Sequence, residues 1–399
     1  MALDFELSSE QKLIQKVVRD IVARLEPRHT EFRRLIHEER RYPPELWDAL
    51  AEAGLMGSLI PEEYGGSGLG LMALVLGLEE LGSTGIGSSP LLVLTGMDAL
   101  CILRNGSEAL RRRFLPEIAT GELKFCFAIT EPDAGSNSFR ISTLARRVDD
   151  YYEISGSKVF ITGVDVADYM LLVTRTAPYA EVHQRELPKA HGLSLFVVPT
   201  DAPGLEKRRL PMRGIEGHNQ FLLFFDRVRV PAENLVGEEN RGAAALFNSL
   251  NPERILAAAS ACGTVAYLLR RAAEYARERK VFGDQPIGAY QGLAHPLAEV
   301  RIDLDAARLL TYRAAWAFDR AAPPAVVGTY ANMAKYLAAE VGVKAADRAI
   351  ETLGGYGFSE EYGIIYAWEG LRLLRTAPVS REMILNYVAE HVLELPRSY

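Results

Sequence analysis

One carboxylate stands in an alanine- and leucine-rich stretch that is typical of a single long helix, "SLNPERILAAASACGTVAYLLRRAAEYARERKVFG", beginning at Ser249. Glu253 could act there as a base toward a bound molecule. It could equally belong to an ordinary helix N-terminus, since Asn251 is a favourable N-cap, Pro252 fits the first helical position and an acid suits the helix dipole. The local pattern predicts that Glu253 lies in the first turn, and it leaves both roles open.

Two other stretches carry groups that could hold a ligand. "FAITEPDAGSNSF", from Phe127 to Phe139, follows a predicted strand, and its backbone amides and hydroxyls could cradle a phosphate or the polar edge of a heteroaromatic ring. An ordinary β-turn would explain the same residues. "IPEEYGGSGLG", which starts at Ile60, is glycine-rich, and a connection between helices is its simpler interpretation.

The composition bounds the class of protein. The 399 residues are 48% hydrophobic and 24% charged, as in a soluble globular protein with two or three domains. A net charge of −7 argues against nucleic acid or an acidic membrane surface as the main partner. Cys101, Cys126 and Cys262 lie far apart and the seven histidines are scattered, so neither a disulfide framework nor a metal site is expected.

The chain also lacks the signals of targeting segments. "MALDFELSSEQKLIQKVV" has neither the apolar core of a signal peptide nor the arginine-rich face of a transit peptide. Apolar runs are all interrupted before about 18 residues, the length that a membrane span needs. We expect a cytoplasmic protein without a membrane span.

Periodicity divides the chain into three parts and predicts an α+β fold. Residues 1–124 have helical periodicity and form an expected N-terminal helical domain. Residues 125–236 contain strand-length runs such as "YYEISGSKVFIT" and form an expected antiparallel, barrel-like β domain, with a solvent loop between Thr176 and His191. Residues 237–399 return to long helices, including Pro324 to Leu353, and form an expected four-helix bundle. P-loop and GxGxxG patterns are absent, so a doubly wound nucleotide domain has no support.

Four motifs give the chain a family resemblance. "TEPDAGSN" resembles the first signature of the acyl-CoA dehydrogenase family, in which a strand and loop line a bound FAD. "GSKVFITGVDVADYMLLV" is similar to the family's next flavin-contacting strand, "ERKVFGDQPIGAYQ" to its "ERxxFGxxIxxxQ", and "LGGYGFSEEY" to its "GGxGxxxEY". The motifs occur in family order, so the resemblance covers essentially the whole chain. The family's fold is the same succession of helical, β and helical parts.

The resemblance implies contacts with the flavin ring in the β part. Phe127, Ile129 and Thr130 would lie along the isoalloxazine, with Thr130 donating to its polar edge. Phe160 falls where relatives often have a tryptophan and would stack on the ring, while Thr162 would hydrogen-bond to the flavin. A place in the protein core is the alternative for Phe160, as it is for Phe282.

The other implied contacts are near the pyrophosphate. Gly135 and Ser136 would lie there, with Ser136 also at the mouth of the acyl-CoA site. In relatives the neighbouring subunit completes the site, with a guanidinium that can pair bidentately with the pyrophosphate. That contribution is implied for Arg279, Phe282, Gln291, Gly354 and Gly355, and the same resemblance adds Ser380 to the flavin contacts. A shared FAD implies at least a dimer, and the family usually forms a homotetramer.

The resemblance also assigns a base. Family members take an α-proton from an acyl-CoA while a hydride leaves the β-carbon for FAD, which gives the trans-2-enoyl-CoA. In many members the base is the Glu of a C-terminal "YEGT", but Pro378 in "LLRTAPVSREMIL" stands at that position here. Isovaleryl-CoA and long-chain enzymes instead take the Glu from a helix opening "LDLERL", which "LNPERIL" matches. The implied base is therefore Glu253, with Arg254 beside it in the substrate site.

Several departures from the family leave alternatives open. Pro378 lacks the N–H that polarises the thioester carbonyl in relatives, Glu351 would disfavour a nearby pyrophosphate, and the stretch before Gln291 is one residue longer than usual. The leading hypothesis is an FAD-dependent acyl-CoA dehydrogenase that passes electrons to electron-transfer flavoprotein. The alternatives are a weakly active or non-catalytic FAD- or acyl-CoA-binding subunit of a hetero-oligomer, and a flavin monooxygenase on the same scaffold.

Overall fold

The computed structural model describes residues 6–86 and 89–397, and these divide into two compact units. The helical unit combines Met1–Thr30, Leu71–Ser88 and Arg254–Tyr399. The sheet unit combines Glu31–Gly70 and Ser89–Glu253, so the division falls inside one long helix, between Glu253 and Arg254.

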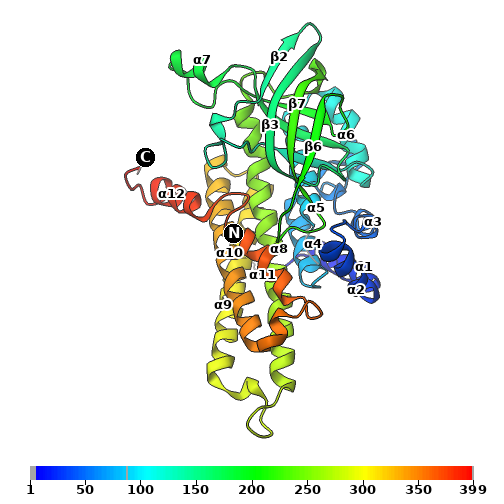
Figure 1. Ribbon diagram of the computed structural model, residues 1–399, viewed down its shortest axis with the longest axis vertical. Helices are drawn as coiled ribbons and strands as arrows, with labels where there is room; N and C mark the ends of the chain where they lie inside the picture. The colour runs from blue at the N-terminus through cyan, green and yellow to red at the C-terminus, as the bar shows by residue number, and fades with distance from the viewer. Residues whose placement is uncertain (1–5, 87–88, 398–399) are drawn as a thin grey trace. The chain divides into compact units, whose positions relative to one another are not determined.

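In its described residues the helical unit has seven helices or parts of helices, of which α9 and α10 are the long antiparallel pair drawn in yellow and orange in Figure 1. α1 begins after Ser8, where a capping box joins Ser8 and Gln11. The elements are α1 (Ser9–Leu25), α4 (Leu71–Gly82), the second part of α8 (Gly242–Glu278), α9 (Gln291–Asp319), α10 (Pro324–Leu353), α11 (Ile364–Leu373) and α12 (Arg381–His391).

Polar contacts fix α4 against α9. The Glu79 carboxylate of α4 accepts hydrogen bonds from Arg308 Nε at 2.5 Å and from the Tyr312 hydroxyl at 2.7 Å, both on α9. The Asp319 carboxylate at the end of α9 accepts from the backbone N–H groups of Leu71 and Met72, at 2.7 and 2.9 Å, and so satisfies free donors at the start of α4. Together these contacts hold two helices that are distant in sequence.

The sheet unit has an eight-stranded sheet in the order β6-β7-β3-β2-β4-β5-β8, with β1 paired to β4. Thr95 ties β1 to α5, because its hydroxyl accepts from Phe125 N at 3.0 Å and donates to Phe125 O at 3.2 Å. The strands are β1 (Phe125–Ala128), β2 (Leu144–Val148), β3 (Tyr151–Thr162), β4 (Tyr169–Arg175), β5 (Leu193–Pro199), β6 (Leu205–Leu210), β7 (Gln220–Pro231) and β8 (Leu235–Val236). The helices are α3 (Pro44–Glu52), α5 (Pro90–Asn105), α6 (Glu108–Thr120) and α7 (Tyr179–Gln184), and α2 (His29–Arg33) lies across the boundary between the units.

The prediction of helical, β and helical parts is confirmed, and three finer expectations are wrong. The sheet is not purely antiparallel, since β1 and β2 each pair with β4 in parallel. The expected solvent loop after Thr176 contains α7. The α8 helix begins at Gly242, so Pro252 lies inside it and Glu253 lies about three turns from its start. The helix dipole therefore does not act on Glu253 as a first-turn acid, because its effect falls off within one turn.

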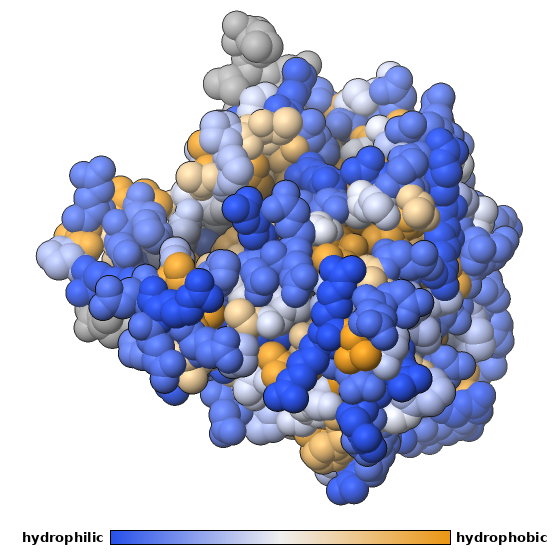
Figure 2. Space-filling model, turned by 90° about the horizontal axis from the view of Figure 1, so that it is seen from above, coloured by the Kyte–Doolittle hydropathy of each residue, from blue (hydrophilic) through white to orange (hydrophobic). Residues whose placement is uncertain are grey.

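One face of the molecule is mostly polar. In the face drawn in Figure 2 hydrophilic residues predominate, and the apolar residues form small separate groups. Among the described residues, every helix falls short of the length and apolar character that a bilayer-spanning helix needs.

A buried ion pair holds the loop after β1 to the sheet. Lys158 of β3 is fully buried, and its ammonium donates to Glu131 Oε1 at 2.9 Å and to the Ile129 carbonyl at 2.8 Å. The Glu131 carboxylate also accepts from the backbone N–H groups of Ser142 and Thr143, at 2.6 and 3.0 Å. Burial would raise the pKa of Glu131, but the Lys158 charge and these hydrogen bonds outweigh it and lower that pKa. Burial lowers the pKa of Lys158 to about 8, and Glu131 opposes that shift.

Replacing Lys158→Met should destabilise the FAD-saturated protein by about 3–5 kcal/mol in urea unfolding, because the Glu131 charge stays buried without its countercharge. The double variant Lys158→Met/Glu131→Gln should recover part of that loss. Lys207→Met, at an exposed position on β6, is the matched control and should change the free energy of unfolding by no more than about 0.5 kcal/mol. Equal effects of the two lysine substitutions would contradict a stabilising role for the pair.

Candidate active site

The end of β1 and the end of β3 lie side by side in the sheet unit. Val159 N donates to the Thr130 carbonyl at 2.9 Å, which joins the residues predicted along the flavin ring to the strand that carries Phe160. Ile129 and Thr130 are partly exposed, whereas Phe127 is buried at 8% exposure. Phe127 is therefore largely covered by the rest of the chain.

An irregularity in strand β3 exposes the Phe160 ring to solvent. The register between β3 and β7 shifts between Lys158 and Ile161, and the backbone of Phe160 has a φ of 58°. A bulky residue in this left-handed region is strained, and such strain gathers at functional sites. The ring is 53% exposed, so the alternative of a core aromatic is wrong for Phe160.

Thr162 and the loop after β1 complete this edge. The Thr162 hydroxyl accepts from Gln220 Nε2 at 2.7 Å, which leaves its own proton available for a ligand. Glu131 and Ala134 exchange backbone hydrogen bonds at 3.1 Å in a tight turn, and Gly135 and Ser136 follow it exposed. A Cβ on Gly135 would meet no atom within 4 Å, so the backbone there is open to a close-lying ligand.

Glu253 is coupled to a buried carboxyl that the sequence reasoning missed. Asp98 of α5 is fully buried, and its pKa is raised well above the usual range, first by burial and then by the charge of Glu253. Glu253 itself is only partly buried. Burial raises the pKa of the Cys126 thiol on β1, and the charge of Asp98 raises it further. Glu253, Asp98 and the start of the predicted flavin-binding strand therefore belong to one neighbourhood of the sheet unit.

The signal for Asp98 was in the sequence. It is the one charged residue between Pro90 and Ile102, in "PLLVLTGMDALCI", a helix that is otherwise apolar enough to be buried all round. Buried acids without a partner are rare, and they concentrate at functional sites.

The helical unit contains a separate cleft of about 670 Å³. Arg279, Phe282, Gly354 and Gly355 all line it, as the resemblance implies, together with Tyr275, Tyr290 and Tyr356. Phe282 has a φ of 53° and is 100% exposed, so the core alternative is wrong here too. Gln291 is not among the lining residues and stands exposed at the first position of α9.

The cleft suits a ligand with anionic and aromatic parts. The Arg279 guanidinium is exposed and makes no hydrogen bond or ion pair with the residues that the structure describes. Cβ atoms on Gly354 and Gly355 would meet nothing within 4 Å, so the backbone there is open. A free guanidinium beside open backbone fits a pyrophosphate, and the exposed aromatic side chains fit a flat heterocycle. The residues present therefore fit FAD.

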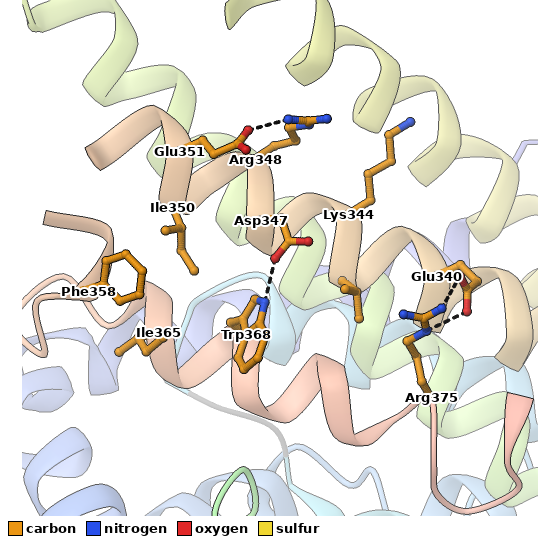
Figure 3. A pocket seen from close by; sticks show the side chains of 11 residues that line it. Glu340, Lys344, Asp347, Arg348, Ile350, Glu351, Phe358, Ile365, Trp368 and Arg375 are labelled. Atoms are coloured by element: carbon orange, nitrogen blue, oxygen red, sulfur yellow. Dashed lines mark hydrogen bonds and ion pairs between the residues drawn. The ribbon is translucent and has the colours of Figure 1, made fainter. Parts of the chain in front are cut away.

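Glu351 lines this cleft, but its charge is offset. An ion pair joins its carboxylate to Arg348, one turn earlier on α10. The repulsion expected toward a pyrophosphate is correspondingly reduced. Figure 3 shows this pair beside a second cavity, of about 570 Å³, whose lining holds two further polar pairs, while its Lys344 pairs with Asp303 outside the lining. There Arg375 pairs with Glu340, and Trp368 Nε1 donates to Asp347 at 2.7 Å.

Among the remaining predicted residues, Ser380 has a structural partner. Ser380 is the N-cap of α12, and its hydroxyl accepts from Met383 N at 3.3 Å. Arg254 is buried at 7% exposure. Pro378 follows Ala377 through a cis peptide bond, and the next carbonyl, that of Val379, accepts from the buried Lys335 ammonium at 2.5 Å.

Comparisons with known proteins agree over the whole chain. The family profiles of the acyl-CoA dehydrogenase N-terminal, middle and C-terminal domains match residues 8–122, 126–228 and 240–393. The acyl-CoA dehydrogenase FadE12 of Mycobacterium tuberculosis is 43% identical over 392 residues, 98% of each chain. The structure of butyryl-CoA dehydrogenase from Megasphaera elsdenii superposes with a TM-score of 0.90 at 30% identity, covering 98% of this chain and 100% of that one.

A third relative is known with its cofactor. The FAD complex of PigA superposes with a TM-score of 0.89 at 27% identity, covering 98% of this chain and 100% of that chain. The matched profiles cover far more than half of the sequence, and the cleft and sheet edge carry side chains suited to a flavin nucleotide. The chain belongs to the FAD-dependent acyl-CoA dehydrogenase family.

Proposed function

We propose that this protein oxidises an acyl-CoA thioester to the trans-2-enoyl-CoA, with Glu253 as the base and electron-transfer flavoprotein as the electron acceptor. FAD, when bound, supplies the acceptor for the hydride that leaves the β-carbon. The observation that carries the proposal is the partly buried Glu253 carboxylate, next to a fully buried acid and near the strand that leads to Thr130.

Glu253 suits the α-proton for an electrostatic reason. Its position inside α8 removes the stabilisation that a helix N-terminus would give to its charge. Glu253 is also partly buried and lies near the fully buried Asp98, so it is not a freely solvated surface acid.

The sheet unit carries groups suited to a flavin ring, and the helical unit carries groups suited to phosphates. Exposed Phe160 offers a flat face, while the Thr162 hydroxyl and the backbone after Thr130 offer hydrogen bonds. Arg279 offers an unpaired guanidinium among the described residues. By analogy with the family, the Arg279 cleft serves the flavin of a neighbouring subunit in a homotetramer, and the helix-borne base goes with a long or branched acyl chain.

The Glu253→Gln variant should bind FAD normally and lose reduction of the flavin by acyl-CoA. Gln is nearly isosteric and cannot accept the α-proton, so the rate of anaerobic flavin bleaching should fall about 10²- to 10⁴-fold. Stopped-flow absorbance with a panel of acyl-CoA thioesters measures that rate. Glu274→Gln, on the same helix and partly exposed, is the matched control and should bleach like the wild type. Normal bleaching of the Glu253 variant would remove the proposed base.

The Arg279→Gln variant should retain FAD poorly. Loss of one charge-assisted contact with the pyrophosphate should weaken FAD binding by about tenfold or more, measured by flavin release on dilution. Arg277→Gln, two residues away and also exposed, should leave FAD affinity unchanged. Equal losses in both variants would indicate a general charge effect, and no loss in either would place the pyrophosphate elsewhere.

A further inference from the structure

A buried amide is bonded to the Thr162 hydroxyl at the sheet edge. Gln220 is the first residue of β7, and it is only 5% exposed. Thr162, the last residue of β3, is its partner across the antiparallel ladder and is partly exposed. Nε2 of Gln220 donates to the Thr162 hydroxyl at 2.7 Å. A covered amide and a hydroxyl that is open to a ligand are therefore in direct contact.

A second acceptor fixes which way the amide points. Nε2 of Gln220 also donates to the backbone carbonyl of His218, at 3.4 Å. A carbonyl oxygen only accepts, so the amide nitrogen and not the amide oxygen must be turned toward it. The opposite orientation would set two oxygens against each other. The same nitrogen therefore faces Thr162, and the Thr162 hydroxyl is the acceptor in their bond.

The carbonyl that orients the amide is itself held in place. The His218 ring is 3% exposed and packs on the Tyr42 ring, with centroids 4.4 Å apart. The next residue, Asn219, donates from Nδ2 to Asp165 at 2.9 Å, and its carbonyl accepts from Gly163 N at 2.9 Å. The segment before β7 is thus tied to the turn after β3. These contacts fix the orientation of the amide before any ligand binds.

The oriented amide decides what the Thr162 hydroxyl does with its proton. An amide oxygen in the same place would accept that proton, whereas an amide nitrogen cannot. The bond from Gln220 is the hydroxyl's only side-chain hydrogen bond among the described residues. The Thr162 proton therefore has no acceptor in the described part of the chain and remains for a ligand at the edge.

We propose that Gln220 is a positioning residue that keeps the Thr162 proton directed at the flavin ring. The inference rests on the proposed function, because the ring is placed at this edge by exposed Phe160, two residues before Thr162. The nitrogen and oxygen atoms of an isoalloxazine ring accept hydrogen bonds. A donor whose orientation is set before binding loses less freedom when the ligand arrives, so it adds more to affinity.

The Gln220→Glu variant should bind FAD more weakly. A carboxylate has nearly the shape of the amide and only accepts, so it takes the Thr162 proton and withdraws it from the ring. The dissociation constant of FAD, measured by flavin release on dilution of the holoenzyme, should rise about tenfold. Gln184→Glu, exposed on α7 in the same unit, adds the same charge elsewhere and should bind FAD like the wild type.

A second background separates proton orientation from charge. Thr162→Val keeps nearly the same shape without the proton, and its FAD affinity should fall about 3- to 10-fold. Adding Gln220→Glu to Thr162→Val should cost little further affinity, because no proton remains to be misdirected. A charge effect or a packing effect of Gln220→Glu would persist undiminished in the Thr162→Val background, and that result would overturn the proposal.

Gln220→Met tests the same idea without a new charge. Its side chain is of similar length, and it offers the Thr162 proton no strong acceptor. The proton then stays available to the ring, so FAD affinity should fall by about threefold or less. A loss as large as that of Thr162→Val would mean that Gln220 acts through packing, which contradicts a role in orienting the proton.

The outcomes distinguish this inference from the proposed function. A Gln220→Glu variant that binds FAD like the wild type overturns the role of Gln220, and so does a Thr162→Val variant with unchanged affinity. Neither result bears on anaerobic bleaching of the wild-type flavin by acyl-CoA, which tests the dehydrogenation. A wild type that no thioester bleaches overturns the dehydrogenation, while the FAD affinities of the variants still decide the role of Gln220.

Discussion

The buried pair of Glu131 and Lys158 is the constraint on which the sheet edge depends. Lys158 joins β3 to the carbonyl of Ile129 and to the Glu131 carboxylate, and Glu131 in turn holds the backbone at Ser142 and Thr143. The loop from Ile129 to Thr143 is therefore held at both of its ends. The register shift that exposes Phe160 begins at Lys158. The Glu131–Lys158 ion pair therefore anchors both the loop after β1 and the part of β3 that carries Phe160. A second buried cation, Arg175, supports the loop from behind through the carbonyl of Ile141 at 3.0 Å.

The tasks are divided between the two units. The sheet unit holds the carboxylate suited to proton transfer and the exposed edge suited to a flat ring, while the helical unit holds the free guanidinium suited to phosphates. Phe160 and Phe282, one in each unit, are both exposed aromatics with positive φ. Two strained, exposed rings of this kind cost stability in the free chain, and a ligand that covers them would offset that cost.

Much of the fold follows from local signals. The predicted helix from Pro324 to Leu353 has those bounds in the structure, because a proline at its start and Gly354 after its end are both strong boundary signals. Pro252 gave a misleading signal, since a proline inside a long helix resembles one at a helix start. The parallel pairing of β1 with β4 is a long-range contact that strand periodicity does not encode.

The site was predictable where motifs carried it. Arg279, Phe282, Gly354 and Gly355 were placed by their motifs and line one cleft, whereas Gln291 follows an extra residue and lies outside its lining. Lys158 was not predicted, because the burial of a charged side chain is decided by tertiary packing. Asp98 was overlooked, although the apolar helix around it carried a signal. Aspartate and lysine side chains are usually exposed, so residue type alone predicted solvent exposure for both side chains.

The most direct measurement is a crystal structure of the FAD-loaded protein with an acyl-CoA analogue that cannot be oxidised. The account predicts a Glu253 carboxyl oxygen about 3–3.5 Å from the α-carbon, on the side of the thioester away from the ring that Phe160 contacts. A Glu253 side chain turned to solvent, or another acid at the α-carbon, would contradict the account.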